Sequence, residues 1–339
     1  MGEDLRADIP PVPAGGHRPL WSVMIPTYHC ADLLRETLAG VLAQDPGPER
    51  MQIEVVDDFS TRDDPEAVVR ELGGGRVAFH RQARNVGHVR NFETCLLRSR
   101  GELVHLLHGD DRVRPGFYAA LERGFGERPD VGMAWCRVEY VDPAGEPVAL
   151  SPEERAEPGV PDGWLGTIAS GQRVATPSVV VRRAVYERLG GFDRRIRCAG
   201  EDWEMWVRIA AHYPVWFEPR VLAEYRVKRT GSLTGDSVGT PKLVRDMRLA
   251  TEIVGGYLAD HLPAPAAGEA LRRARSQYAR WALNDATDLL ARRRVAAALP
   301  HLAEALRCSR SPRVVRRAAR VLLGSLRHWL PGSSPAGGT

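Results

Sequence analysis

Short apolar runs alternate with segments of helical periodicity along the first third of the chain. The runs have the length of buried strands and cover 20–25, 51–57, 76–80 and 102–107. Apolar residues repeat at helical spacing in 31–44, 87–99 and 115–125. We expect Pro26 to end the first strand and Pro115 to occupy the first helical position of the third helix. The alternation predicts βαβ units, and therefore a parallel sheet with right-handed crossovers.

The rest of the chain changes from this alternation to mostly helical periodicity. Further strands are expected at 131–138, 178–182 and 221–226, with a Pro- and Glu-rich stretch at 142–163. A helix is expected at 200–212, with Glu201 and Asp202 in its first turn and an apolar face of Trp203, Trp206, Val207 and Ala210. The segment 228–240 has the Gly, Ser and Thr content of a mobile loop. Beyond 241 every signal is helical.

Composition and charge narrow the function classes. The chain of 339 residues is 43% hydrophobic and 27% charged, which is ordinary for a globular protein of about two domains. Seven of its 47 Lys and Arg residues follow Ala305, where there is no acid, so 40 basic and 43 acidic residues precede it. The body therefore lacks an excess of basic residues, and we expect no nucleic-acid partner. Five cysteines stand singly, which indicates neither a zinc site nor a disulfide framework and fits a reducing cytoplasm.

The most informative motif is His-Leu-Leu-His-Gly-Asp-Asp at 105–111, where an apolar run ends in two carboxylates. A buried parallel strand would deliver Asp110 and Asp111 to the sheet edge at which open α/β folds bind ligands. Carboxylate oxygens suit Mg²⁺ or Mn²⁺, and such ions commonly bridge a protein carboxylate to nucleotide phosphates. The motif therefore predicts a metal and diphosphate site.

Two other interpretations of this motif are open. The aspartates are also common residues before a helix, and here they would simply cap the one that follows. Alternatively, His105 and His108 would join them in a transition-metal hydrolase cluster. Strand geometry disfavours that cluster, because residues three apart on a strand point to opposite faces.

Five motifs in one order carry a family resemblance. They are Val-Met-Ile-Pro-Thr-Tyr at 23–28, Glu-Val-Val-Asp-Asp-Phe-Ser at 54–60, Arg-Asn-Val-Gly at 84–87, Leu-His-Gly-Asp-Asp at 107–111, and Gly-Gly-Phe-Asp at 190–193 followed by Gly-Glu-Asp at 200–202. With them the chain resembles the family 2 inverting glycosyltransferases of the GT-A fold over about 20–226. The resemblance implies an α/β fold with a central, mainly parallel sheet, followed by a helical C-terminal region.

The resemblance also implies roles for individual residues. Pro26, Thr27, Tyr28, Asp57 and Asp58 match positions around the base and ribose of the donor nucleotide. Arg84 and Asn85 match a loop that closes over it. Asp110 and Asp111 match an Asp-x-Asp-like element that binds the metal and the donor, with Asp111 the direct ligand. Asp202 matches the catalytic base, with Glu201 as the second candidate.

Each assignment has a structural alternative. Asp57 and Asp58 would serve as a strand-end turn, Arg84 and Asn85 as an ordinary loop, and Glu201 with Asp202 as a helix N-terminal charge pair. If Asp202 is the base, an ordinary Asp pKa near about 3.9, favoured further by the helix N-terminus, would leave it ionised at neutral pH.

The chain departs from the family pattern at three points. His29 stands where the family usually has Asn, and His108 where it often has an acid. The Gln-x-x-Arg-Trp motif of processive synthases is absent after Asp202, and no run reaches the ~18 apolar residues of a membrane span. We therefore expect transfer of a single sugar. The alternatives are a sugar nucleotidyltransferase, which should carry a Gly-rich loop after its first strand, and an inactive GT-A-like scaffold subunit.

Partners and domains follow from this interpretation. We expect 1–19 to be a disordered lead, 20–235 the GT-A catalytic domain, 236–330 a helical region and 331–339 a disordered tail. The expected partners are Mg²⁺ or Mn²⁺, a UDP- or dTDP-type sugar, and a glycan, lipid-linked or small-molecule acceptor. Loops at 142–171 and 228–240 would select among them.

The last helix is basic and amphipathic, which suits either a membrane surface or docking on its own domain with a solvated basic face. Its apolar face carries Val315, Ala318, Ala319, Leu322, Leu326, Trp329 and Leu330. A cytoplasmic protein is expected, with peripheral contact to the inner face of the plasma membrane if the first alternative holds.

Overall fold

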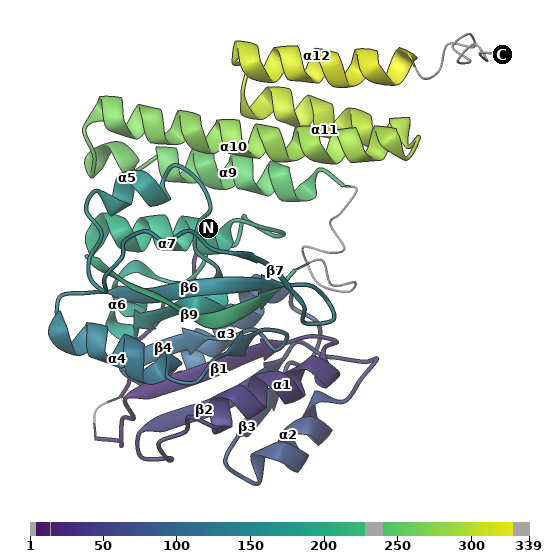
Figure 1. Cartoon of the computed structure of the whole chain (residues 1–339). Helices are drawn as coiled ribbons and strands as arrows, with labels where there is room; N and C mark the ends of the chain where they lie inside the picture. The colour runs from purple at the N-terminus through teal and green to yellow at the C-terminus, as the bar shows by residue number, and fades with distance from the viewer. Residues whose placement is uncertain (1–4, 14, 228–239, 328–339) are drawn as a thin grey trace.

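A nine-stranded mixed sheet forms the centre of the computed structural model, which describes residues 5–13, 15–227 and 240–327 (Figure 1). The strand order is β3-β2-β1-β4-β8-β6-β9-β5, and β7 pairs with β6. The strands are β1 (Trp21–Thr27), β2 (Met51–Asp57), β3 (Ala78–Arg81), β4 (Leu103–Leu106), β5 (Arg112–Val113), β6 (Met133–Val141), β7 (Pro147–Leu150), β8 (Val179–Arg182) and β9 (Val215–Arg226). The expected α/β fold with a helical C-terminal region is confirmed.

The first four strands form the parallel half of the sheet. Their connections run through α1 (Ala31–Leu42), α2 (Pro65–Gly73) and α3 (His88–Arg98), which makes three successive βαβ units. The sequence pattern did not predict α2, although Asp64 caps it by accepting a hydrogen bond from the Ala67 amide at 3.1 Å.

The prediction that Pro26 ends the first strand is wrong, because β1 continues to Thr27 opposite Asp57. A residue in a parallel strand directs its N–H and C=O to the same neighbour. The Pro26 carbonyl accepts from the Gly109 amide, so its missing N–H falls on the side of β4, whose pairing with β1 ends at Met24. The proline therefore costs the central strand little.

The other half of the sheet is mixed rather than parallel. Strand β8 runs antiparallel to both β4 and β6, whereas β6 and β9 are parallel. Strand β9 is longer than predicted, and the short strands β5 and β7 were not predicted. Both have too few residues to show a pattern of period two.

Helices cover both faces of the sheet. Successive residues of a strand point to opposite faces, so Val23 and Ile25 pack in one core and Met24 in the other. The core around Val23 also takes residues of α1, α2 and α4 (Phe117–Glu127). Pro115 was predicted to lie in the first helical position, but α4 begins after Gly116, whose φ of 87° closes the preceding turn.

The other face carries most of the remaining helices. The core around Met24 takes residues of α3, α5 (Trp164–Ile168), α6 (Arg183–Leu189) and α7 (Glu201–His212). It continues without a break into α9 (Lys242–Gly255), α10 (Ala264–Ala291), α11 (Val295–Cys308) and α12 (Pro312–Arg327). The C-terminal helices are therefore stacked on α7 and α5 as one body with the sheet (Figure 1).

The expectation of a disordered lead at 1–19 needs correction. Ala7 and Ile9 are buried, and the Ala7 carbonyl accepts a hydrogen bond from the Gly191 amide at 2.8 Å. Arg6 forms ion pairs at 3.1 Å with the buried carboxylates of Asp193 and Glu204. Ala7, Ile9 and Arg6 therefore hold the N-terminal segment against the rest of the protein, although the segment is otherwise polar. The Asp193 carboxylate of the Gly-Gly-Phe-Asp motif thus holds the N-terminal segment.

Helix α12 docks on its own protein. Val314 and Ala318 are buried against α10 and α11, while Val315, Leu322 and Leu323 are exposed. The predicted single apolar face is therefore divided between a docked and an exposed side. Trp329 and Leu330, and all but one residue of the predicted loop at 228–240, lie outside the described residues. Within 5–13, 15–227 and 240–327, each helix is too short or too polar to cross a membrane.

Candidate active site

The acidic pair lies in the turn that follows β4, at the carboxyl edge of the parallel strands. Asp111 is 1% exposed, and its Oδ1 accepts a hydrogen bond from the Arg226 amide at 2.9 Å. The Thr37 hydroxyl of α1 donates to the Asp111 carbonyl at 2.8 Å. Backbone and carboxylate are thus fixed from two other elements, and the position is more than a cap for α4, which begins six residues later.

His108 belongs to the same cluster. Its Nδ1 lies 3.3 Å from Asp111 Oδ2, and ligand atoms of His108, Asp110 and Asp111 all fall within 4.8 Å of one another. Neither Asp111 Oδ2 nor His108 Nε2 meets hydrogen-bond geometry with a described residue, although both atoms are buried. A buried carboxylate oxygen and imidazole nitrogen without such partners are what a divalent cation would satisfy.

Charge around this cluster changes the titration of both groups. Burial, together with the Asp110 carboxylate, raises the pKa of Asp111 to about 6. Burial by itself would lower the pKa of His108, but its contact with Asp111 and the charges of Asp110 and Glu201 outweigh that effect and raise it. The cluster therefore holds protons that a bound cation would displace.

The alternative in which His105 and His108 share an ion is wrong. The His105 ring lies within β4, with Nδ1 3.3 Å from the Tyr118 hydroxyl and Nε2 3.0 Å from the Pro177 carbonyl. Burial lowers its pKa to about 3, so the ring is neutral. His105 is a core histidine, as the alternation of strand faces indicated.

Asp57 and Asp58 lie at the end of β2 and are both buried. Asp57 accepts hydrogen bonds from the Ser60 amide and hydroxyl and forms an ion pair with Arg81 at 2.8 Å. Asp58 accepts from the Val86 and Gly87 amides at 2.7 and 3.0 Å, in the two residues that precede α3. Asp58 thus holds the loop of Arg84 and Asn85 in place, and Asn85 Nδ2 donates to the Asp58 carbonyl at 3.2 Å.

The first motif lies beside the acidic cluster. The Thr27 hydroxyl is buried and lies 2.9 Å from Cys30 Sγ, whereas Tyr28 is 40% exposed and packs on the His29 ring at 3.9 Å. Gly109 touches this motif so closely that a Cβ there would lie 2.8 Å from Thr27 Oγ1. An exposed aromatic ring at this edge is available to a flat ligand, whereas Pro26 is buried.

Asp202 lies in the first turn of α7. The turn before it needs glycine, because Gly200 has a φ of 96° and a Cβ there would lie 2.7 Å from Met247 Sδ of α9. Asp202 Oδ1 accepts from the Trp203 amide at 2.6 Å, and Oδ2 accepts from Gln172 Nε2 at 2.8 Å. Burial and the neighbouring Glu201 raise the pKa of Asp202 to about 7. The expected ordinary pKa is thus wrong, since burial outweighs the helix N-terminus.

Glu201 has a different partner. Its Oε1 lies 3.2 Å from His88 Nε2, at the start of α3. The charges of His88 and His108 lower the pKa of Glu201 against the effect of burial. The start of α3 therefore reaches the helix that carries Asp202, and the two acidic clusters lie close enough to affect each other's protonation.

The C-terminal helices contribute to this site, which the sequence did not indicate. The Tyr278 hydroxyl of α10 accepts a hydrogen bond from the Gln172 amide at 3.1 Å, and Gln172 in turn holds Asp202. The Tyr278 ring also packs edge-on against Trp203 at 5.7 Å. Gln172 and Tyr278 carry no motif, whereas the sequence indicated His108 as a ligand only in the alternative cluster with His105.

Comparison with known proteins agrees with this architecture. The model of the family "Glycosyl transferase family 2" matches residues 22–187. The chain carries a family 2 glycosyltransferase domain. The match includes the first four motifs and ends before Asp202. The chain is 39% identical over 127 residues to the uncharacterized protein MT1568 of Mycobacterium tuberculosis, which covers 37% of this chain and 39% of that protein. It spans less than two thirds of the length of the curated relatives that it matches.

Two solved structures share the fold at low sequence identity. Residues 1–349 of TarS from S. aureus, in complex with UDP-GlcNAc, superpose with a TM-score of 0.60 at 19% identity and cover 80% of both chains. The mannosyltransferase PcManGT of Pyrobaculum calidifontis, in complex with GDP-Man and Mn²⁺, gives a TM-score of 0.53 at 19% identity. That superposition covers 97% of this chain and 85% of PcManGT. These likenesses extend the GT-A-like architecture beyond the matched domain.

Proposed function

We propose that this protein is a metal-dependent inverting glycosyltransferase that moves one sugar from a nucleoside-diphosphate sugar to an acceptor hydroxyl. The observation that carries the proposal is the pairing of an acidic cluster that could hold a cation with the half-buried carboxylate of Asp202, whose pKa is raised to about 7. An inverting transfer needs a charge sink at the leaving diphosphate and a base at the acceptor hydroxyl. The two clusters meet these needs within the family 2 fold.

His108, Asp110 and Asp111 are the residues that would hold the divalent ion. Two carboxylates suit Mg²⁺ or Mn²⁺, and an added imidazole moves the preference toward Mn²⁺. When bound, the ion would neutralise the charge that develops on the donor diphosphate. The Mn²⁺ in the PcManGT complex is consistent with this choice.

Asp202 is the proposed base. Oδ1 and Oδ2 are oriented by the Trp203 amide and by Gln172, so the carboxylate has one fixed direction. A pKa near 7 lets it accept the acceptor proton at neutral pH with a larger driving force than an ordinary Asp would have. Glu201 is a poorer candidate, because it is paired with His88.

The donor nucleotide is proposed to lie on the edge formed by β1, β2 and the loop before α3. Tyr28 offers a ring face, and Arg84 and Asn85 lie on the loop that Asp58 holds. Pro26, Thr27 and Asp57 would shape the edge, with the Asp57 carboxylate acting through Ser60 and Arg81. A UDP- or dTDP-type donor is the proposal, and the UDP-GlcNAc complex of TarS supports the first.

The acceptor is proposed to be a glycan, a lipid-linked sugar or a small molecule, met in the cytoplasm or at the inner face of the plasma membrane. Helix α12 supports contact with a membrane surface, because its exposed side combines Val315, Leu322 and Leu323 with Arg316 and Arg320. Flotation with anionic liposomes tests this contact. The variant L322E/L323E should stay in solution where the wild-type protein floats, and equal flotation of both contradicts it.

Titration calorimetry with UDP, dTDP and GDP, each with and without Mn²⁺, tests the donor and metal proposals. One diphosphate should bind at least about tenfold more tightly with the ion. The matching sugar donors are then incubated with candidate acceptors, and the products are identified by mass spectrometry. Metal-independent binding of every diphosphate would contradict the proposed metal site, and metal-dependent binding without transfer would indicate an inactive scaffold.

A further inference from the structure

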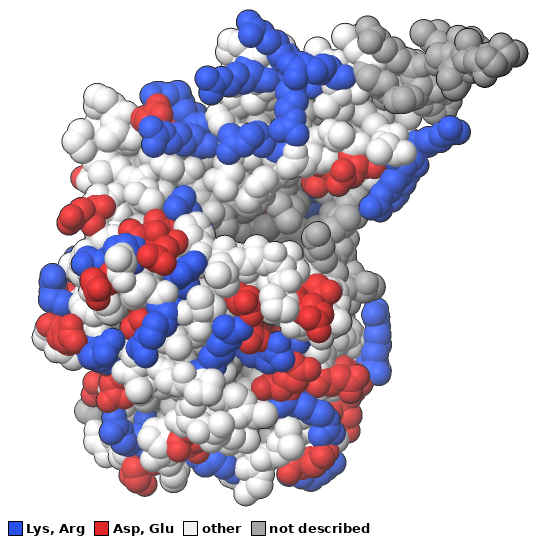
Figure 2. Space-filling model, viewed as in Figure 1, with Lys and Arg blue, Asp and Glu red and all other residues white. Residues whose placement is uncertain are grey.

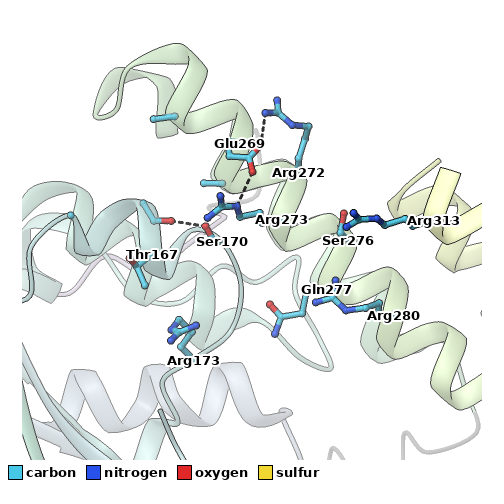
Figure 3. Close-up of a pocket in the computed structure, with 14 residues that line it drawn as sticks. Thr167, Ser170, Arg173, Glu269, Arg272, Arg273, Ser276, Gln277, Arg280 and Arg313 are labelled. Carbon is cyan, nitrogen blue, oxygen red and sulfur yellow. Dashed lines mark hydrogen bonds and ion pairs between the residues drawn. The ribbon is translucent and has the colours of Figure 1, made fainter. Parts of the chain in front are cut away.

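A basic groove lies where the C-terminal helices meet the catalytic domain. It has a volume of about 880 Å³ and is bounded by α5, the loop that follows α5, α10 and the start of α12 (Figure 3). Its charged lining consists of Arg173, Arg272, Arg273, Arg280, Arg313 and Glu269. We call these residues the arginine groove. None of them belongs to the acidic cluster or to the proposed donor edge.

The arginine groove has more positive charge than its own partners neutralise. Arg272 and Arg273 share Glu269, with Nε of Arg273 2.7 Å from its Oε1. Arg173 pairs with Glu154 at 2.8 Å. Among the described residues, Arg280 and Arg313 have neither an ion pair nor a side-chain hydrogen bond. Figure 2 shows Lys and Arg side chains gathered over the C-terminal helices, in contrast to the mixed charges over the sheet.

The groove also offers neutral donors between its guanidinium groups. The Thr167 hydroxyl lies on the α5 side and Ser276 with Gln277 on the α10 side, whereas the Ser170 hydroxyl donates to the Gly166 carbonyl at 2.7 Å. Figure 3 shows Arg313 extending from α12 toward Ser276. Guanidinium groups with hydroxyl and amide donors on two walls form a set that recognises phosphate oxygens.

The groove shares a wall with the proposed base. A Cβ at Gly171 would lie 1.7 Å from Gln277 Oε1, so α10 touches the loop directly. The next residue, Gln172, donates from its amide to Tyr278 and from its side chain to Asp202 Oδ2. The following residue, Arg173, lines the groove. One short loop therefore both lines the groove and contacts the proposed base.

We propose that the arginine groove binds phosphate groups carried by the acceptor, so that the acceptor of this enzyme is a phosphate-bearing molecule. The inference rests on the proposed function, because it assigns the groove to the acceptor side of Asp202. Phosphate chemistry is favoured over carboxylate chemistry because several guanidinium groups face one space, where a phosphate offers three oxygens to receive them. The phosphate source is either a lipid head group or a soluble phosphate.

The test compares binding of inorganic pyrophosphate by three forms of the full chain in excess chelator. They are the wild-type protein, R280E/R313E in the groove, and R275E/R310E as the control. The control makes the same change of charge at two exposed positions outside the groove, one on α10 and one just before α12. R280E/R313E should weaken binding at least about tenfold, while the control should change it less than about twofold. Equal binding by all three forms, or equal loss in both variants, overturns the inference.

Two further measurements follow. One distinguishes a lipid-borne from a soluble phosphate, and the other distinguishes failure of this inference from failure of the proposed function. Dihexanoyl phosphatidic acid that binds the wild-type protein but not R280E/R313E supports a lipid-borne phosphate, and binding of pyrophosphate alone supports a soluble one. Binding of UDP with Mn²⁺ should be the same in all three forms, because the groove lies apart from the donor edge. Failure of UDP, dTDP and GDP alike to bind the wild-type protein contradicts the proposed function, whereas loss of the groove effect with nucleotide binding intact contradicts only this inference.

Discussion

The two acidic ends of the site are built in different ways. The proposed metal end takes His108, Asp110 and Asp111 from one turn of the chain and is fixed by neighbours in the sheet domain. At the proposed base end, Asp202 is held by Gln172, 30 residues before it, and Gln172 is held by Tyr278, 106 residues after Gln172. The C-terminal helices are therefore a structural part of the site and not an appendage to a complete catalytic domain.

The comparison is tested most strongly by removing the proposed base. D202N keeps the shape of the side chain but cannot accept a proton, so the turnover number should fall about a thousandfold. Binding of UDP with Mn²⁺ should not change, because the donor edge is formed by other elements. The measurement is steady-state transfer together with calorimetry on the same protein. Transfer at the wild-type rate would show that Asp202 is not the base.

Substitution at the proposed metal end should cause a loss of activity that added metal can restore, unlike the loss in D202N. D111N loses a carboxylate that would bind the ion, so activity should fall about a hundredfold, and much of it should return at high Mn²⁺ concentration. Titration of Mn²⁺ against activity measures both effects. N284A, on the C-terminal helix α10, is a control that should behave as wild type, since Asn284 is exposed and accepts a hydrogen bond from Arg317 of α12. Loss of turnover with unchanged Mn²⁺ affinity would contradict metal ligation by Asp111.

Lowering the pH should reduce the turnover number at a higher pH than it would if Asp202 had the pKa of an ordinary Asp. A base works only when ionised, and the pKa of Asp202 is raised to about 7. The turnover number should therefore fall about tenfold for each pH unit below 7. Protons also compete with the ion at His108 and Asp111. Every assay therefore contains saturating Mn²⁺, so that this competition does not affect the pH profile. A profile that stays flat down to pH 5 would contradict a base with this pKa.

The same division explains what the sequence could predict. The strands β1, β2 and β4 and the pair Asp110 and Asp111 were predicted because a buried strand and the polar turn after it are adjacent in sequence. Gln172 and the raised pKa of Asp202 were not, because both depend on packing between distant segments. The burial of Ile9 was missed for the same reason, because a single apolar residue in a polar stretch gives no hydrophobic periodicity.

The smallest predicted effects test the base end alone. Gln172 donates to Asp202 and favours its ionised form, so Q172A should raise the midpoint of the pH profile and lower the turnover number about tenfold at pH 7. Y278F removes the hydroxyl that accepts from the Gln172 amide and should move the midpoint in the same direction, with a loss of about threefold.

Y257F is the matched control for Y278F, because Tyr257 is a partly buried tyrosine whose hydroxyl contacts Glu204 of α7 instead of the Asp202 network. It should leave the midpoint unchanged. If Y278F and Y257F lower activity equally without moving the midpoint, the C-terminal helices only stabilise the fold. If Y278F alone moves it, they set the protonation of the base, which is what a site shared between the two regions requires.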